Sequence, residues 1–138
     1  MAVHGDVVMF TTKGDDRIWE YNIATGLNRI RYQAGEPTLC GVDNVWIDQK
    51  SGMVFVAEDG GDMQVVMLRP DNTLVTVAQI PGQQWSEVTG PCLSPDGQHL
   101  YFNSQRGVLG STEEPIGIPV GISYCISGPW NELMASHA

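Results

Sequence analysis

The sequence predicts an all-β fold: a partial β-propeller of about three four-stranded antiparallel blades, equivalent to half of a six-bladed ring. Three observations support this prediction. The chain repeats with a period of 46 residues, three such periods fill its 138 residues, and each unit is a series of short β-rich runs that end in turn residues. A repeat of roughly 40 to 50 residues with four short strands is typical of a propeller blade.

The period is visible in three matching segments that begin at Val7, Met53 and His99. They read VVMFTTKGDD, MVFVAEDGGD and HLYFNSQRGV, and each is a β-rich run that ends in a turn signal. A single β-sandwich would explain the strands and turns but not the constant offset. The sequence therefore favours a propeller, with the whole chain (1–138) as one partial propeller domain.

The first unit, about residues 1–36, begins at what would be its second strand, so we expect its innermost strand to be missing. The second unit, 37–82, reads as a complete four-stranded meander. The third unit, 83–130, carries an insertion at 107–121, and the polar tail 131–138 is all that remains to supply its fourth strand. The expected strands are residues 7–12, 17–22, 27–32, 45–48, 63–68, 74–78, 92–94 and 122–126, together with the runs that begin at Met53 and His99.

The charge balance excludes several classes of partner. Seven basic residues against 16 acidic ones give a formal net charge of −9. This charge repels phosphate backbones and anionic lipids, so neither nucleic acid nor a membrane surface is expected as a partner. The start of the chain has no signal-peptide features, which predicts a cytoplasmic protein for the sequence as written. The odd number of widely spaced cysteines, Cys40, Cys92 and Cys125, predicts buried free thiols.

Acidic residues gather in loops that a propeller brings to one end. Asp43 and Asn44 precede the first strand of unit two, Glu58 ends its second strand, and Glu87 precedes the first strand of unit three. Alternation places Glu58 on the side of an apolar row, where a carboxylate must be paired, protonated or bound to a metal. We therefore expect Glu58, Glu87, Asp43 and the Asn44 carbonyl to hold a Ca²⁺-like cation.

Other polar residues form a weaker group near these loops. Asp59, Asp15, Asp16 and Arg106 are candidates for an additional site. Each of these acidic positions also has a simpler explanation as a turn, a side-chain cap or solvated charge. The sequence assigns no catalytic residue, because Gly-x-Ser-x-Gly and a phosphate-binding loop are both absent.

An ordered set of segments resembles the PhoX-type bacterial alkaline phosphatase family. The segments are Gly41–Asn44, Val56–Gly60, Ser86–Gly97 and Leu100–Gly107, with a family-like closing strand at 122–130. The resemblance implies a calcium-dependent, in part iron-containing propeller enzyme that hydrolyses phosphate esters. It further implies that Glu58 and Glu87 are metal-ligand candidates and that Asp43 and Asn44 line the same pocket. Family members are about three times longer or more, are usually exported, and contribute ligands from blades that have no counterpart here.

Two functions from different classes follow. The first is a non-catalytic assembly or binding module that keeps the fold and a cation. The second is a metal-dependent phosphate-ester hydrolase, which acts on a small phosphorylated ligand and whose site is completed by a second chain or a missing N-terminal half. Because three blades leave two open flanks, we expect a homo-oligomer, with a dimer preferred.

Overall fold

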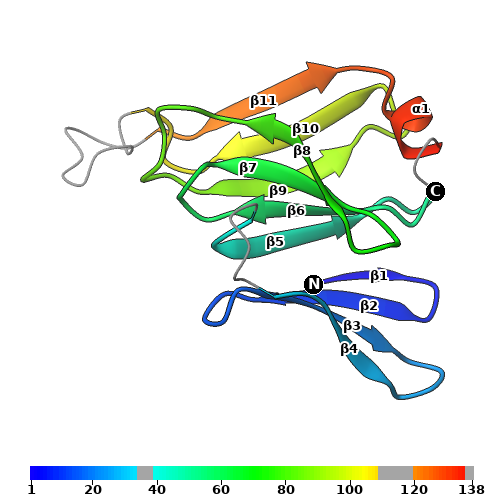
Figure 1. Ribbon diagram of the computed structural model, residues 1–138. Coiled ribbons are helices and arrows are strands. Elements are labelled where there is room, and N and C mark those ends of the chain that lie inside the picture. Colours follow the sequence, from blue (N-terminus) through cyan, green and yellow to red (C-terminus); the bar gives the residue numbers. More distant parts are fainter. Residues whose placement is uncertain (34–38, 109–119, 136–138) are drawn as a thin grey trace.

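The computed structural model describes residues 1–33, 39–108 and 120–135, and these residues form an all-β chain with little helix. Eleven strands in the described part make three antiparallel sheets of four, four and three strands. The sheets are stacked in chain order, with the first at the bottom and the third at the top of Figure 1. The predicted all-β class and the three successive antiparallel sheets are therefore confirmed.

The first sheet contains a strand that the sequence analysis missed. Residues 2–4 fold back across the turn at Gly5 and pair with residues 7–9, so the innermost strand of unit one is present and its expected absence is wrong. Gly5 has a φ of +56°, which suits so tight a turn, and a strand of three residues is too short to show alternation. In spatial order the sheet is β1 (Ala2–His4), β2 (Val7–Thr12), β3 (Arg17–Asn22) and β4 (Asn28–Gln33).

The second sheet lies between the other two. Every residue of its two inner strands is buried, as expected for a sheet that is covered on both faces. Its first strand begins three residues earlier than expected, so Asp43 and Asn44 lie within the strand and not before it. In spatial order the sheet is β5 (Val42–Ile47), β6 (Val54–Glu58), β7 (Gln64–Leu68) and β8 (Leu74–Gln79).

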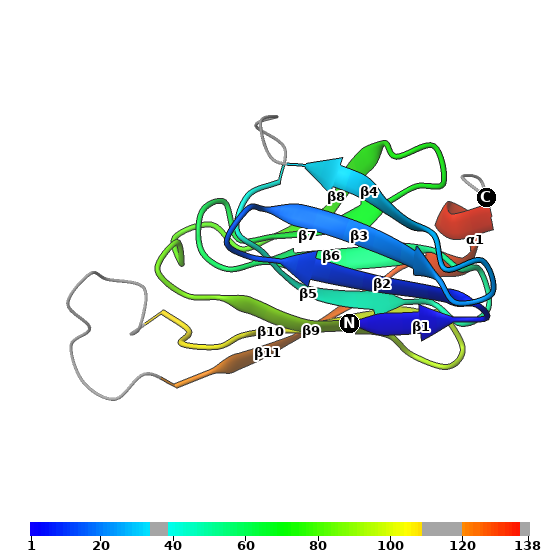
Figure 2. The same cartoon turned by 90° about the horizontal axis from the view of Figure 1, so that it is seen from below.

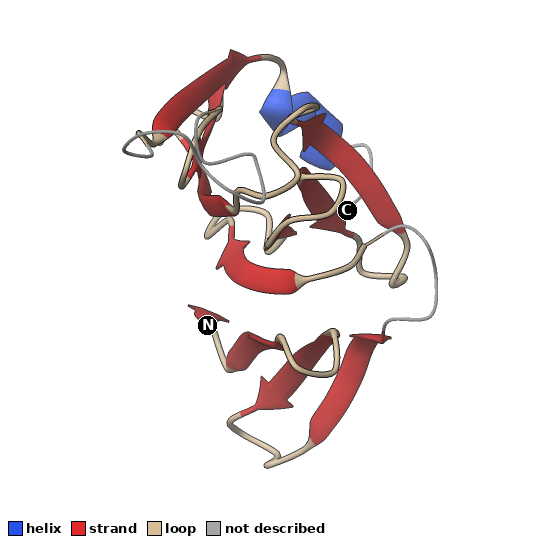
Figure 3. Ribbon diagram, turned by 90° about the vertical axis from the view of Figure 1, so that its left-hand side faces the viewer, coloured by secondary structure: helices blue, strands red, loops and turns tan. Residues whose placement is uncertain are grey.

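The third sheet has three strands, in the order β11 (Ile122–Ser127), β10 (His99–Ser104) and β9 (Val88–Leu93). The tail does not supply a fourth strand: residues Trp130–Ala135 form the helix α1, and 136–138 lie outside the described residues. The spacing of Trp130, Leu133 and Met134 places three apolar side chains on one helical face, and these side chains pack against the core between the second and third sheets. Figure 3 shows the helix in blue. Most of the insertion at 107–121 also lies outside the described residues.

Each sheet turns one face toward the sheet before it in the chain, its backward face, and one toward the sheet after it, its forward face. Met9 of the first sheet packs with Val54 and Val56 of the second in one hydrophobic core. Phe55 and Ala57, on the forward face of the second sheet, pack in another core, which takes its third-sheet members from the backward face of that sheet. A forward face therefore packs on a backward face twice within the chain.

None of the residues that the structure describes covers the backward face of the first sheet. Figure 2 looks directly onto this sheet. We call this backward face the outer face of the first sheet. Strand register places six apolar or aromatic side chains on it, and three of them are exposed by 38% to 46%. These residues are Val3, Val8, Phe10, Trp19, Tyr21 and Ile30.

Candidate cation site

A β-bulge in β5 positions Asp43. Val42 pairs with Glu58 and Asn44 pairs with Ala57, so Asp43 has no partner in β6. A bulge of this kind re-aims a side chain out of the regular alternation of a strand. The hydroxyl group of Thr11 in β2 donates a hydrogen bond to the Asp43 carbonyl, which fixes the bulge to the first sheet.

Asp59 and Glu87 come from the ends of two further strands. Asp59 follows β6 directly, and its backbone N–H donates to the carbonyl of Gly41, 2.7 Å away. Gly41 has a φ of +62°, and a Cβ atom there would lie 2.6 Å from the Asp59 carbonyl oxygen, so this close approach requires glycine. Glu87 precedes β9, and its carbonyl accepts a hydrogen bond from the N–H of Gln105 at 2.9 Å.

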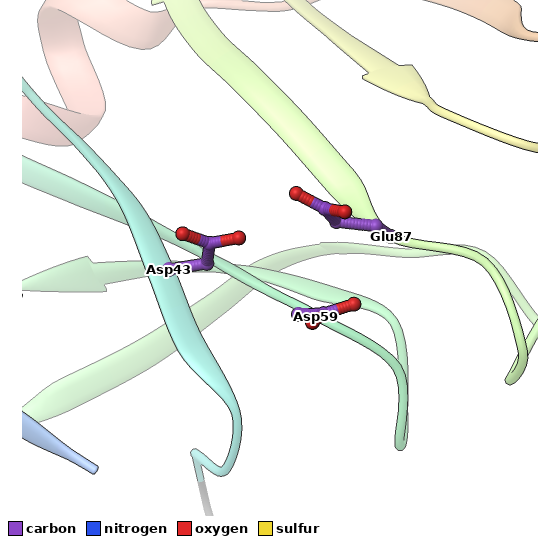
Figure 4. Close-up of side chains that lie close together, drawn as sticks. All are labelled: Asp43, Asp59 and Glu87. Carbon is purple, nitrogen blue, oxygen red and sulfur yellow. The ribbon is translucent and has the colours of Figure 1, made fainter. Parts of the chain in front are cut away.

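The three carboxylates converge (Figure 4). One oxygen atom from each of Asp43, Asp59 and Glu87 lies within 4.8 Å of the others. We call these three residues the acid cluster. The structure thus brings together two of the predicted ligands, Asp43 and Glu87, and adds Asp59, which the sequence analysis had assigned to an additional site. The cluster spans the junction between the second and third sheets.

Two basic side chains flank the acid cluster. Lys13 contacts the Asp59 carboxylate, and its Nζ atom lies 3.9 Å from an Asp43 oxygen. Arg106, predicted for the additional site, has its Nη2 atom 4.0 Å from a Glu87 oxygen. Three acidic and two basic groups leave a formal charge of −1. Lys13 was not predicted as a site residue, although it stands one period of 46 residues before Asp59, which could have signalled that the two occupy equivalent turns.

The acid cluster is electrostatically crowded. Burial raises the pKa of Glu87, and its hydrogen bond to Asp43 and the Asp43 charge raise it further, against the opposing charges of Lys13 and Arg106. Two neighbouring carboxylates that both ionise repel each other. Either a shared proton or a bound cation would relieve this repulsion.

Glu58 lies outside the acid cluster. Its side chain is fully buried, as alternation predicts, but its oxygens face backbone amides. Oε1 accepts a hydrogen bond from the N–H of Cys40 at 3.1 Å, and Oε2 accepts one from the N–H of Gln64 at 2.8 Å. Burial raises the pKa of this carboxyl group. In the structure, Glu58 therefore ties the segment before β5 to the start of β7.

Ser104 supports this structural interpretation of Glu58. It stands one period after Glu58, at the same place in its strand, and is also fully buried. Its hydroxyl oxygen accepts a hydrogen bond from the N–H of Gly107 at 3.2 Å and donates to Gln83 at 2.6 Å. The two units thus use a buried polar side chain at the end of the second strand to satisfy the following turn.

The remaining predicted residues are engaged elsewhere. The Oδ1 atom of Asn44 accepts a hydrogen bond from the N–H of Gly90 in β9, 3.3 Å away, which links the second and third sheets. Asp16 accepts one from the backbone N–H that opens β5, at 3.2 Å. Asp15 forms an ion pair with Arg17 at 2.9 Å. The carboxylates of Asp15 and Asp16 and the side-chain amide of Asn44 are not part of the acid cluster.

The acid cluster has a composition suited to a hard cation. Ca²⁺ takes six to eight oxygen ligands at about 2.3–2.6 Å, so oxygens on opposite sides of one ion are about 5 Å apart. The separations within the cluster match this arrangement. Three carboxylates can supply up to six oxygens, and solvent can reach the site because the Asp43 side chain is 31% exposed.

The three cysteines are free thiols, as predicted, but they are not buried. Cys40 and Cys125 are exposed and Cys92 is partly exposed. The strand register explains two of them, because Cys92 and Cys125 flank Tyr101 on the forward face of the third sheet, away from the core.

Among the described residues, no helix has both the length and the apolar character needed to cross a membrane. Comparison with protein-family models, with curated proteins and with solved structures finds no match to this chain.

Proposed function

We propose that this chain is a non-catalytic assembly module that associates with a second copy of itself. One observation carries the proposal: the outer face of the first sheet is apolar at positions that are core in the other two sheets. Val8 corresponds to Val54 and Leu100, one and two periods later. These two counterparts are 5% and 0% exposed because a preceding sheet covers them, whereas Val8 is partly exposed.

Phe10 repeats the pattern. Its counterparts Val56 and Phe102 are 0% and 3% exposed, and both pack against the preceding sheet. Phe10 stacks on Trp19 with ring centroids 6.2 Å apart, and both rings remain partly exposed. Large unpartnered apolar faces of this kind mark interaction surfaces. The sequence therefore keeps a core composition on a face that no described residue covers.

A propeller gives this association its expected form. Two copies of a three-sheet unit supply six sheets, a common number of blades in a closed ring. The sequence period and the forward-on-backward packing of successive sheets support this architecture. We also propose a relation to PhoX-type phosphatases, and the sequence segments quoted above support it.

Solution mass tests the assembly. We expect the protein to sediment at a multiple of 15.1 kDa at micromolar concentration, with the preferred species a dimer. A Tyr21→Lys, Ile30→Lys double variant places two charges on the outer face and should sediment as a monomer with an unchanged circular dichroism spectrum. Leu27→Lys is the matched control, because Leu27 is 70% exposed in the turn between β3 and β4. A wild-type protein that stays monomeric would contradict the proposal.

The acid cluster supports a second proposed role, the binding of a Ca²⁺-like cation that joins the second and third sheets. A cation bound to the folded state alone raises the melting temperature. Millimolar calcium should therefore raise the melting temperature of the wild type, and EDTA should reverse the rise. An Asp43→Asn, Glu87→Gln double variant should show no shift. Asp71→Asn is a suitable control, since Asp71 lies in the turn before β8 and hydrogen bonds to Thr73.

The alternative function is metal-dependent hydrolysis of phosphate esters. It requires the acid cluster to hold a metal with further ligands from another chain, and the iron that the family resemblance implies. An aryl phosphate assayed with calcium, and with calcium plus iron, tests it directly. Turnover that disappears in the Asp43→Asn, Glu87→Gln variant would favour this alternative over a non-catalytic module.

A further inference from the structure

We infer that the partner surface for the outer face of the first sheet is the forward face of the third sheet of a second copy. This inference rests on the proposed assembly function and specifies its geometry. Within the chain, forward faces pack on backward faces at both sheet junctions. Two faces remain unpartnered among the described residues: the backward face of the first sheet and the forward face of the third. A forward face packs on a backward face inside the chain, so these two free faces are of the kinds that pack on each other.

Positional equivalence identifies the forward face of the third sheet as an interface. Met9 and Phe55, which stand two and one periods before Tyr101, are 1% and 0% exposed because the next sheet covers them. Tyr101 is 42% exposed. An aromatic ring with a polar tip at this position suits a surface that is covered in an assembly and wet when free.

The charge distribution points to the same surface. The three strands of the third sheet, 18 residues in all, contain no Asp, Glu, Lys or Arg, in a chain with 23 such residues. The centres of protein interfaces are depleted in charged residues, because removing a charge from water is costly. The forward face of this sheet thus shares the absence of charge that is typical of an interface centre. It carries Tyr101, His99, the cysteines Cys92 and Cys125, and the uncharged polar residues Thr89, Asn103, Ser123 and Ser127.

This arrangement is a head-to-tail contact, in which different surfaces of the two copies meet. In such a contact each copy uses both of its free faces, and two copies can close into a ring with two equal junctions. A face-to-face contact, with the first sheets of two copies packed on each other, would instead leave both third-sheet faces free. The two geometries predict different effects for a change at Tyr101.

The first test is Tyr101→Lys, analysed by sedimentation beside the Tyr21→Lys, Ile30→Lys variant. We expect each to weaken association at least about tenfold, since each buries a charge in the same junction. Tyr101 is exposed in the free chain, so the variant should fold, which circular dichroism checks. An oligomer that dissociates with the first-sheet variant but not with Tyr101→Lys would overturn the inference while leaving the proposed assembly function intact.

The second test maps the contact by cross-linking. Val3 lies on β1, and the backbones of the equivalent first strands β5 and β9 run nearest to the preceding sheet. A Val3→Cys variant in a Cys40→Ser background should therefore cross-link to Cys92 or Cys125 of another copy through a short bismaleimide. Mixing ¹⁵N-labelled and unlabelled chains shows by mass spectrometry that the link is between copies. Leu27→Cys in the same background is the control and should give no such link. Links that join residue 3 to residue 3 would overturn the inference.

Discussion

Replacing Glu58 with alanine should destabilise the protein by about 2–5 kcal/mol. The side chain is fully buried, and it accepts hydrogen bonds from two backbone amides. A buried donor that loses its acceptor costs about 1–3 kcal/mol. The full cost applies to the buried bond from Gln64, whereas the partly exposed bond from Cys40 can be replaced by water, so the sum stays below the maximum for two bonds.

The loss should depend on pH, with a definite sign. Burial raises the pKa of Glu58 in the folded state above its ordinary value of 4.5. The stability that this group contributes is therefore fully present below the ordinary value and declines as the pH rises through the raised pKa. We expect the difference in unfolding free energy between the wild type and Glu58→Ala to be larger near about pH 4 than near about pH 7.

Urea denaturation followed by circular dichroism measures this difference, and amide hydrogen exchange at Gln64 reports the loss of the bond itself. Glu132→Ala, on the exposed side of α1, is the control and should change stability by less than about 0.5 kcal/mol. A loss below about 1 kcal/mol for Glu58→Ala, or unchanged exchange at Gln64, would refute this interpretation. The Glu58→Gln variant should keep the calcium-induced rise in melting temperature. Loss of that rise in the variant would show that Glu58 is a ligand of the cation.

Three further predictions concern the core and the acid cluster. Phe55→Ala should lose about 3–5 kcal/mol of unfolding free energy in urea, because Phe55 is fully buried between the second and third sheets; a loss near that of an exposed residue would contradict this packing. Gly41→Ala should lose about 1–3 kcal/mol and abolish the calcium-induced shift in melting temperature, since its Cβ would strike the Asp59 carbonyl. Glu87 has a raised pKa, so the advantage of the wild type over Glu87→Gln in unfolding free energy should be greatest below the ordinary value of 4.5 and decline as the pH rises; an advantage that grows with pH would show the opposite shift.

The combination of predictions separates the acid cluster from the core. Glu58→Ala should act on stability with or without calcium, because its bonds are to the backbone. Replacing Asp43 or Glu87 should change stability mainly by removing cation binding and the repulsion between the two carboxylates, because both side chains still contact solvent. The variants expected to weaken association, at Tyr21, Ile30 and Tyr101, lie neither in the acid cluster nor in the core.

Much of the fold could be predicted because the repeat is local in the sequence. Alternating apolar residues and turn residues recur every 46 positions, and alternation places Glu58 on a buried side before any coordinates are known. The short strand β1 and the helix α1 escaped prediction for different reasons. Three residues carry too little pattern to show a strand, and six helical residues are held by packing of Trp130 and Met134 more than by their own preference.

By itself, the sequence determined the all-β class, the order of three sheet-forming units and the group of acidic residues that a single end of the sheets would gather. The tertiary structure decided which of those carboxylates meet. A bulge turns Asp43 toward Asp59 and Glu87, while two backbone amides engage Glu58. The physical reason is that alternation gives the side of a strand on which a residue lies, whereas a ligand set depends on loop ends and bulges fixed by contacts far apart in the chain.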